Sequence, residues 1–155
     1  MGSDSPEKGP YVPPRVRSPS PEEKLASPSI KTRPTLILAE DRPEVAEYFA
    51  GVLKEHFEIV AIVADGDILV ELVNQRRPDA IVSDVGLKGL NGIAATIKIR
   101  QHDPNVPIVL ITASTDPDLR IAGLTAGASA FLSKIETAHK LVAVLRHFVE
   151  RANPR

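Results

Sequence analysis

Apolar residues recur along the chain in two alternating patterns once the first 34 residues are passed. Five short runs rich in Val, Ile and Leu have the composition of strands buried on both faces, and they lie at residues 35–39, 57–63, 79–83, 106–111 and 129–133. Between these runs the apolar spacing is helical. The first helical face carries Val45, Phe49, Val52 and Leu53, and the last carries Leu141, Leu145, Phe148 and Val149.

Five strands alternating with five helices predict an α/β fold. Consecutive parallel strands are joined by right-handed crossovers, which place helices on both faces of one sheet. Prolines near the expected boundaries, such as Pro43, Pro78 and Pro117, agree with this division, and Asp116 is a possible cap of the helix that Pro117 opens. We therefore expect a doubly wound, five-stranded parallel sheet.

The composition changes sharply near Pro34. Residues 1–34 are crowded with Pro and Ser and have few large apolar side chains, so they cannot bury enough surface to offset the entropy of ordering. We expect a disordered N-terminal extension over residues 1–34, one globular domain over residues 35–152 and a short tail at 153–155.

Charge and cysteine content exclude several classes of function. The formal net charge of -1 gives no basic surface for phosphates of nucleic acid, so direct nucleic-acid binding is not expected. The absence of cysteine rules out disulfides and thiolate metal sites. No apolar stretch is long enough for a membrane span, and no signal peptide is recognisable. These features predict a cytoplasmic protein without membrane contact.

Polar residues with phosphate and metal chemistry stand at the ends of four predicted strands. Glu40 and Asp41 follow the first strand, Asp84 the third, Thr112 the fourth and Lys134 the fifth. Each has an ordinary explanation when taken alone, such as a turn or a helix N-terminus. Because the carboxyl ends of parallel strands meet at one edge of a sheet, we expect these side chains to converge. Three carboxylates favour Mg²⁺, and a hydroxyl with an ammonium group favours phosphate.

The motifs at these strand ends resemble a two-component response-regulator receiver domain over residues 35–152. The matching segments are LILAED at 36–41, DVGLKGLNG at 84–92, IVLITA at 108–113 and AGASAFLSK at 126–134. The resemblance implies a flavodoxin-like (βα)5 fold with strand order 2-1-3-4-5. Such a domain acts as a phosphorylation switch.

The resemblance also implies roles for individual residues. Asp84 would accept the phosphoryl group, and Thr112, Lys134 and the backbone N–H of Ala113 would contact its oxygens. Mg²⁺ would be held by Glu40, Asp41, Asp84 and the backbone carbonyl of Gly86. Thr112 and Phe131 would form a coupled switch; the alternative is that Phe131 is an ordinary core residue.

Partners follow from the same resemblance. The phosphoryl donor would be a sensor histidine kinase, a histidine phosphotransfer protein or a small acyl phosphate, and the output would pass to a downstream effector protein or domain. A phosphorylation-dependent homodimer is compatible with this scheme. The chain would catalyse only its own aspartyl phosphorylation and dephosphorylation, so it is not expected to be an enzyme for external substrates.

Three positions depart from the family pattern: Lys88 and Ile135 stand where proline is usual, and Phe131 where tyrosine is frequent. A pseudo-receiver, which keeps the fold and binds proteins independently of phosphorylation, therefore stays as the alternative. The last strand and its loop resemble receivers that precede a helix-turn-helix domain. The sequence stops at Arg155, so we expect either output by protein contacts alone or an effector domain outside this sequence.

Overall fold

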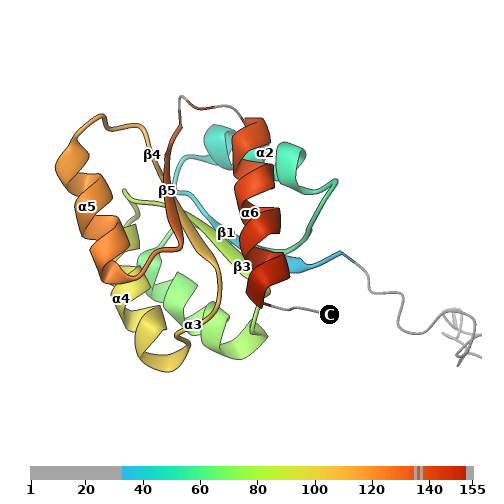
Figure 1. Cartoon of the computed structure of the whole chain (residues 1–155), viewed down its shortest axis with the longest axis horizontal. Helices are drawn as coiled ribbons and strands as arrows, with labels where there is room; N and C mark the ends of the chain where they lie inside the picture. The colour runs from blue at the N-terminus through green and yellow to red at the C-terminus, as the bar shows by residue number, and fades with distance from the viewer. Residues whose placement is uncertain (1–32, 135, 137, 153–155) are drawn as a thin grey trace, which may run out of the picture. The chain divides into compact units, whose positions relative to one another are not determined.

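Figure 1 shows a computed structural model of the chain, which describes residues 33–134, 136 and 138–152. The strands are β1 (Thr35–Ala39), β2 (Glu58–Val63), β3 (Ala80–Asp84), β4 (Ile108–Thr112) and β5 (Ala130–Ser133). The helices are α2 (Pro43–Leu53), α3 (Gly66–Arg76), α4 (Gly92–His102), α5 (Pro117–Ala126) and α6 (Ala138–Ala152). The predictions for residues 1–32, Ile135 and residues 153–155 lie outside the described residues.

The five strands form one parallel sheet in the order β2-β1-β3-β4-β5. This confirms the predicted fold class and strand order. Every strand after β1 is reached through a helix, which is the connection that parallel neighbours require. The chain crosses from β2 over β1 to β3, so β1 and β3 are central neighbours whose carboxyl ends lie side by side.

Strand boundaries differ from the prediction by one or two residues, for local reasons. Phe57 still donates its N–H to the carbonyl of Leu53, so the turn after α2 ends before β2 begins. The carboxylate of Asp79 accepts the N–H of Thr35 at 2.8 Å, which places Asp79 before the first ladder pair of β3. Pro107 has no N–H to donate, and β4 begins at Ile108.

Two apolar layers cover the sheet. Leu36, Leu38 and Val82 pack with the buried side of α2 and α6, while Ile37, Ile81 and Leu110 pack with α3 and α4 on the other face. Figure 1 shows these two groups of helices on opposite sides of the strands. The near-continuous burial of β1, β3 and β4 is typical of a sheet covered on both faces.

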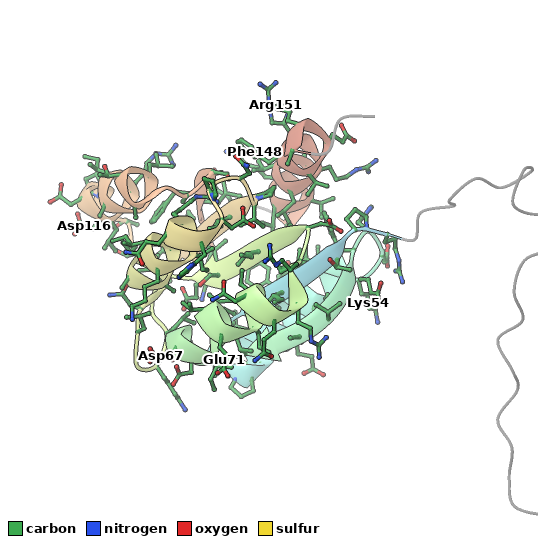
Figure 2. The ribbon with its side chains drawn as sticks, turned by 90° about the horizontal axis from the view of Figure 1, so that it is seen from below. Lys54, Asp67, Glu71, Asp116, Phe148 and Arg151 are labelled. Carbon is green, nitrogen blue, oxygen red and sulfur yellow. The ribbon has the colours of Figure 1, made fainter. Side chains whose placement is uncertain are left out.

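Charged side chains project from the outer faces of the helices. In Figure 2 the labelled side chains of Asp67 and Glu71 on α3 and of Arg151 on α6 point away from the sheet, and all three are exposed. Asp116 precedes α5 and accepts the N–H of Asp118 at 2.9 Å, which confirms its predicted capping role. None of the helices in the described part of the chain has both the length and the hydropathy of a membrane-spanning segment.

Candidate functional site

Three carboxylates gather at the carboxyl ends of β1 and β3. Glu40 and Asp41 follow β1, and Asp84 is the last residue of β3. One oxygen from each of the three lies within 4.8 Å of the others. Glu40 and Asp84 are only 2% and 8% exposed, so water screens their charges weakly. Such a cluster of buried acids requires nearby positive charge.

Lys134 supplies part of that charge from the end of β5. Its Nζ lies 2.7 Å from Oε1 of Glu40 and 3.4 Å from Oδ2 of Asp84. Its backbone N–H donates to the carbonyl of Thr112 at 2.7 Å, which fixes the start of the lysine side chain beside β4. Three carboxylates against one ammonium still leave an excess of negative charge, which a divalent cation would offset.

Backbone contacts hold Glu40 in place. Its N–H donates to the carbonyl of Val63 at 2.8 Å, which extends the pairing of β1 with β2 by one residue. Its Oε2 accepts the N–H of Arg42 at 3.1 Å, while Oε1 receives Lys134. Both oxygens of Glu40 therefore have protein donors, which lowers the cost of burying this carboxylate.

Thr112 ends β4 within the same group of strand termini. Ile111, the preceding residue, is the register partner of Asp84 across β3 and β4. Thr112 is 6% exposed, and its hydroxyl oxygen accepts the N–H of Ser114 at 3.0 Å. Ala113 follows it on the exposed surface. The structure thus brings the predicted acidic residues, Thr112 and Lys134 to one edge of the sheet.

The loop from β3 to α4 places the backbone of Gly86 beside Asp84. A Cβ atom built on Gly86 would lie 3.8 Å from Oδ2 of Asp84. Lys88 donates its N–H to the carbonyl of Ala64 at 3.2 Å, and Gly66 donates to the carbonyl of Lys88 at 3.1 Å. The loop is therefore joined to the loop before α3, and proline at position 88 could not make the first of these bonds. The Lys88 side chain is exposed.

Two glycines at the site had no predicted role. A Cβ on Gly92 would lie 2.3 Å from the carbonyl oxygen of Asp84, and one on Gly66 would lie 1.8 Å from the carbonyl oxygen of Leu90. Both glycines allow a close approach of backbone to backbone. Each glycine is the first residue of its helix and directly follows the capping residue, Asp65 for α3 and Asn91 for α4.

Glu136 lies just beyond Lys134 and binds back to β5. Its Oε1 accepts the N–H of Ser133 at 2.8 Å, and its Oε2 accepts Nζ of Lys140 at 2.5 Å. The hydrogen bond from Lys140, with that from Ser133, lowers the pKa of Glu136. The ionised carboxylate is thus the form that holds this turn.

Phe131 lies on the opposite side of the sheet from α2 and α6. It is 5% exposed and packs in the apolar layer that includes Leu110, its register partner on β4. Thr112 and Ser133 are the next register pair on the same face, since side chains alternate along a strand. On this face of the sheet, the pair that contains Phe131 is therefore next to the pair that contains Thr112.

The family model of the response regulator receiver domain matches residues 36–146, which is most of the chain. This chain belongs to the response regulator receiver family. Such domains are parts of two-component signalling systems and are not a classical enzyme family. The DNA-binding response regulator MtrA of Mycolicibacterium smegmatis is 33% identical over 119 residues, which cover 77% of this chain and 52% of MtrA.

Solved structures agree with this receiver assignment. A response regulator from Chloroflexus aurantiacus is 31% identical, with a TM-score of 0.73, and the match covers 77% of this chain and all of that one. The receiver domain of the sensor histidine kinase PA1611 from Pseudomonas aeruginosa, described with magnesium in its active-site cleft, is 29% identical with a TM-score of 0.70. That match covers 76% of this chain and 98% of that one.

This receiver chain spans about half the length of the curated relatives it matches, 50% and 52% for two of them. The family match includes the acidic cluster, since Glu40, Asp41 and Asp84 all lie within residues 36–146. The similarity therefore concerns the receiver part of those relatives.

Proposed function

We propose that this receiver domain accepts a phosphoryl group on Asp84 with the help of Mg²⁺ and changes its surface in response. The donor would be a phosphohistidine on a sensor histidine kinase or phosphotransfer protein, or a small acyl phosphate. The observation that carries the proposal is the position of Lys134, whose ammonium group lies 2.7 Å from Glu40 and 3.4 Å from Asp84 at the common edge of the strands.

The donor set fits a hard divalent cation. Glu40, Asp41 and Asp84 present clustered carboxylate oxygens, and the carbonyl of Gly86 is the proposed backbone ligand. Mg²⁺ prefers oxygen ligands and commonly joins carboxylates to phosphate oxygens. When bound, it would offset the negative charge on the phosphoryl oxygens.

Asp84 is the proposed nucleophile. A bond forms between one of its carboxylate oxygens and phosphorus while the bond from phosphorus to the donor nitrogen breaks, and the electron pair of the broken bond stays on the imidazole nitrogen. The ammonium group of Lys134, the hydroxyl of Thr112 and the N–H of Ala113 would stabilise the charge on the equatorial oxygens. These groups act by position, so the chain modifies only its own aspartate.

Thr112 and Phe131 are the proposed switch. A phosphoryl oxygen that binds the Thr112 hydroxyl would draw that side chain toward Asp84 and leave space beside it for the aromatic ring. The surface that responds would be formed by α5, β5 and α6. We propose that this surface engages a downstream effector protein or domain, or a second phosphorylated copy, and not nucleic acid directly.

Intact mass measurement after incubation with acetyl phosphate and Mg²⁺ tests the phosphorylation step. The expected result is a gain of one phosphoryl group that disappears when Mg²⁺ is removed by a chelator. Asp84→Asn is expected to abolish the gain. Asp118→Asn is the matched control, because Asp118 is an exposed aspartate outside the acidic cluster, and it is expected to behave like the wild type.

The two candidate functions give opposite results in this experiment. A gain that survives in Asp84→Asn would place the modification elsewhere and contradict the assignment. No gain in the wild-type protein would favour a pseudo-receiver that binds its partners without phosphorylation.

A further inference from the structure

Helix α5 is attached to the sheet differently from the other helices. Within this fully described helix, the residue that is buried is Gly123. Of its large apolar residues, Leu119 is partly buried against the layer that contains Phe131, whereas Ile121 and Leu124 are 63% and 40% exposed. By contrast, α3 buries Leu69 and Val73, and α4 buries Ala95 and Ile99. The apolar stripe that attaches α5 to the sheet is therefore narrower than those of α3 and α4.

The ring of Phe131 occupies the space that a side chain at position 123 would need. A Cβ atom on Gly123 would lie 2.7 Å from Cδ2 and 2.9 Å from Cε2 of Phe131, and 3.0 Å from Cδ1 of Leu110. Contacts this short require a displacement. A glycine inside a helix is less favourable than alanine, so its presence here is explained by the room it leaves for the ring.

The remaining contacts of α5 with its neighbours include two arginine hydrogen bonds. Nη1 of Arg120 donates to the carbonyl of Phe131 at 2.7 Å, so a second α5 residue holds the same β5 residue. Nε of Arg100 donates from α4 to the carbonyl of Gly127, the C-cap of α5, at 2.8 Å. The apolar attachment of α5 to the sheet thus includes Leu119 and the hollow where Gly123 receives Phe131.

The hollow over Gly123 that holds the Phe131 ring, which we call the seat, lies next to the proposed switch residue Thr112. Phe131 faces the same side of the sheet as Thr112, and its register partner Leu110 lies two residues before Thr112 on β4. Movement of the ring along this face would change its contact with α5, because the ring fills the hollow over Gly123. Phe131 therefore lies near Thr112 at the carboxyl end of β4 and also contacts α5, so a change in its ring position links these two places.

We propose that Gly123 is a positioning residue, which seats Phe131 inward and thereby links the occupancy of the Asp84 site to the docking of α5. This inference rests on the proposed function and specifies its regulation. Phosphorylation draws Thr112 inward and favours the seated ring. By reciprocity, a change that disfavours the seated ring must weaken binding of a phosphoryl group or its mimic, at most by the factor with which phosphorylation favours that ring position.

The test compares Gly123→Ala with Gly51→Ala. Gly51 lies in α2, is exposed, and would present its Cβ to no atom within 4 Å, so it reproduces the chemical change without the clash. Hydrogen exchange of α5 amides and ¹H NMR contacts of the Phe131 ring are measured without ligand. Gly123→Ala is expected to displace the ring and speed α5 exchange relative to α3, whereas Gly51→Ala leaves both unchanged.

The coupling is measured with beryllofluoride, a tetrahedral mimic of the phosphoryl group, by ¹⁹F NMR in the presence of Mg²⁺. Gly123→Ala is expected to weaken beryllofluoride binding by roughly 5- to 150-fold, the usual range of coupling between sites. Binding of Mg²⁺ alone should change less than about 2-fold, because a coupling confined to the switch leaves the carboxylates in place. A general loss of structure would lower both affinities.

Phe131→Leu provides the second variant. If the clash with the ring is the cause, Gly123→Ala should have little further effect in the Phe131→Leu background, which a double-mutant cycle reveals. The inference is overturned if Gly123→Ala leaves the ring position, α5 exchange and beryllofluoride binding unchanged, or if its effects persist in full without the ring.

Failure of the proposed function would be recognised separately. A wild-type protein that gains no phosphoryl group and binds no beryllofluoride contradicts that function. In that case the ring position in ligand-free Gly123→Ala tests whether Gly123 positions Phe131. A displaced ring supports this role, and an undisplaced ring overturns it.

Discussion

At the scale of single residues, Lys134 is the internal counter-ion of the acidic cluster. Its ammonium group contacts the two most buried acids, Glu40 and Asp84, and its side chain is itself only 14% exposed. An ion pair removed from water gains less than its Coulomb energy, because both charges lose hydration. The pair is therefore better suited to keeping the site charged and ordered than to adding stability.

Lys134→Met should destabilise the protein most strongly when Mg²⁺ is absent. The substitution leaves Glu40 as a buried carboxylate without its ammonium partner, and breaking such a pair costs up to about 3–5 kcal/mol. We expect about 2 kcal/mol here, since Lys134 and Asp84 retain some contact with water. Urea unfolding with and without Mg²⁺ measures the effect.

The metal should offset part of this loss, because it replaces the missing positive charge and stabilises the folded state in proportion to its binding. Lys98→Met, at an exposed position on α4, is the matched control and should be neutral. Equal stability of Lys134→Met and the wild type without Mg²⁺ would contradict the role of Lys134 as counter-ion.

At the scale of elements, the loops before α3 and α4 are interlocked. The N–H of Lys88 donates to Ala64, the N–H of Gly66 donates to Lys88, and Gly66 leaves no room for a side chain under the carbonyl of Leu90. The loop that contains Gly86, the proposed backbone ligand, thus takes its shape from a neighbouring loop. Lys88 contributes through its backbone.

Gly66→Ala is expected to weaken Mg²⁺ binding. Its Cβ would lie 1.8 Å from the carbonyl oxygen of Leu90, so the loop after β3 must move and shift Gly86 relative to Asp84. Loss of an outer support of a metal site typically lowers affinity by about 10- to 100-fold. Isothermal titration calorimetry with Mg²⁺ measures the change.

Lys88→Ala is the control for this effect, since it retains the N–H and removes an exposed charge. It should bind Mg²⁺ within about 3-fold of the wild type, because the loss of one exposed charge is largely screened by solvent. If Gly66→Ala bound Mg²⁺ with wild-type affinity, the contacts between the loops before α3 and α4 would not position the metal site.

The elements themselves were predictable because their apolar patterns are strong. The predicted run at residues 106–111 overlaps the strand Ile108–Thr112 but misplaces both of its ends, since the ends depend on Pro107 and on the partner strand. Asp84, Thr112 and Lys134 could be assigned to strand ends from sequence. The contact of Lys134 with Glu40, 94 residues away, and the contact of Gly66 with Leu90 depend on tertiary packing and have no local pattern.

At the scale of the whole molecule, the site depends on the order of the strands. The crossover from β2 past β1 to β3 makes β1 and β3 neighbours, so their terminal acids meet, and β4 and β5 add Thr112 and Lys134 on one side. The two apolar layers hold this arrangement from opposite faces. The acidic edge is therefore a property of the topology, and every strand and apolar layer that forms it lies beyond residue 32.

A chain that begins at Arg33 should be as stable and as active as the full chain. All five strands and both apolar layers lie within the described residues. Arg33 is retained because its guanidinium group donates to the carbonyl of Lys54. We expect a change in the free energy of unfolding of less than about 0.5 kcal/mol, which is usual for changes away from buried contacts, and the same gain of one phosphoryl group.

A chain that begins at Thr35 is the matched control. Pro34 accepts the N–H of Glu58 at 2.8 Å at the start of β2, so this longer truncation removes a hydrogen bond as well as the Arg33 contact. It should lose about 1 kcal/mol relative to the chain that begins at Arg33. Urea unfolding of the three proteins places the domain boundary. A loss of more than about 1 kcal/mol on removing residues 1–32 alone would assign those residues to the folded domain, because surface changes rarely cost so much.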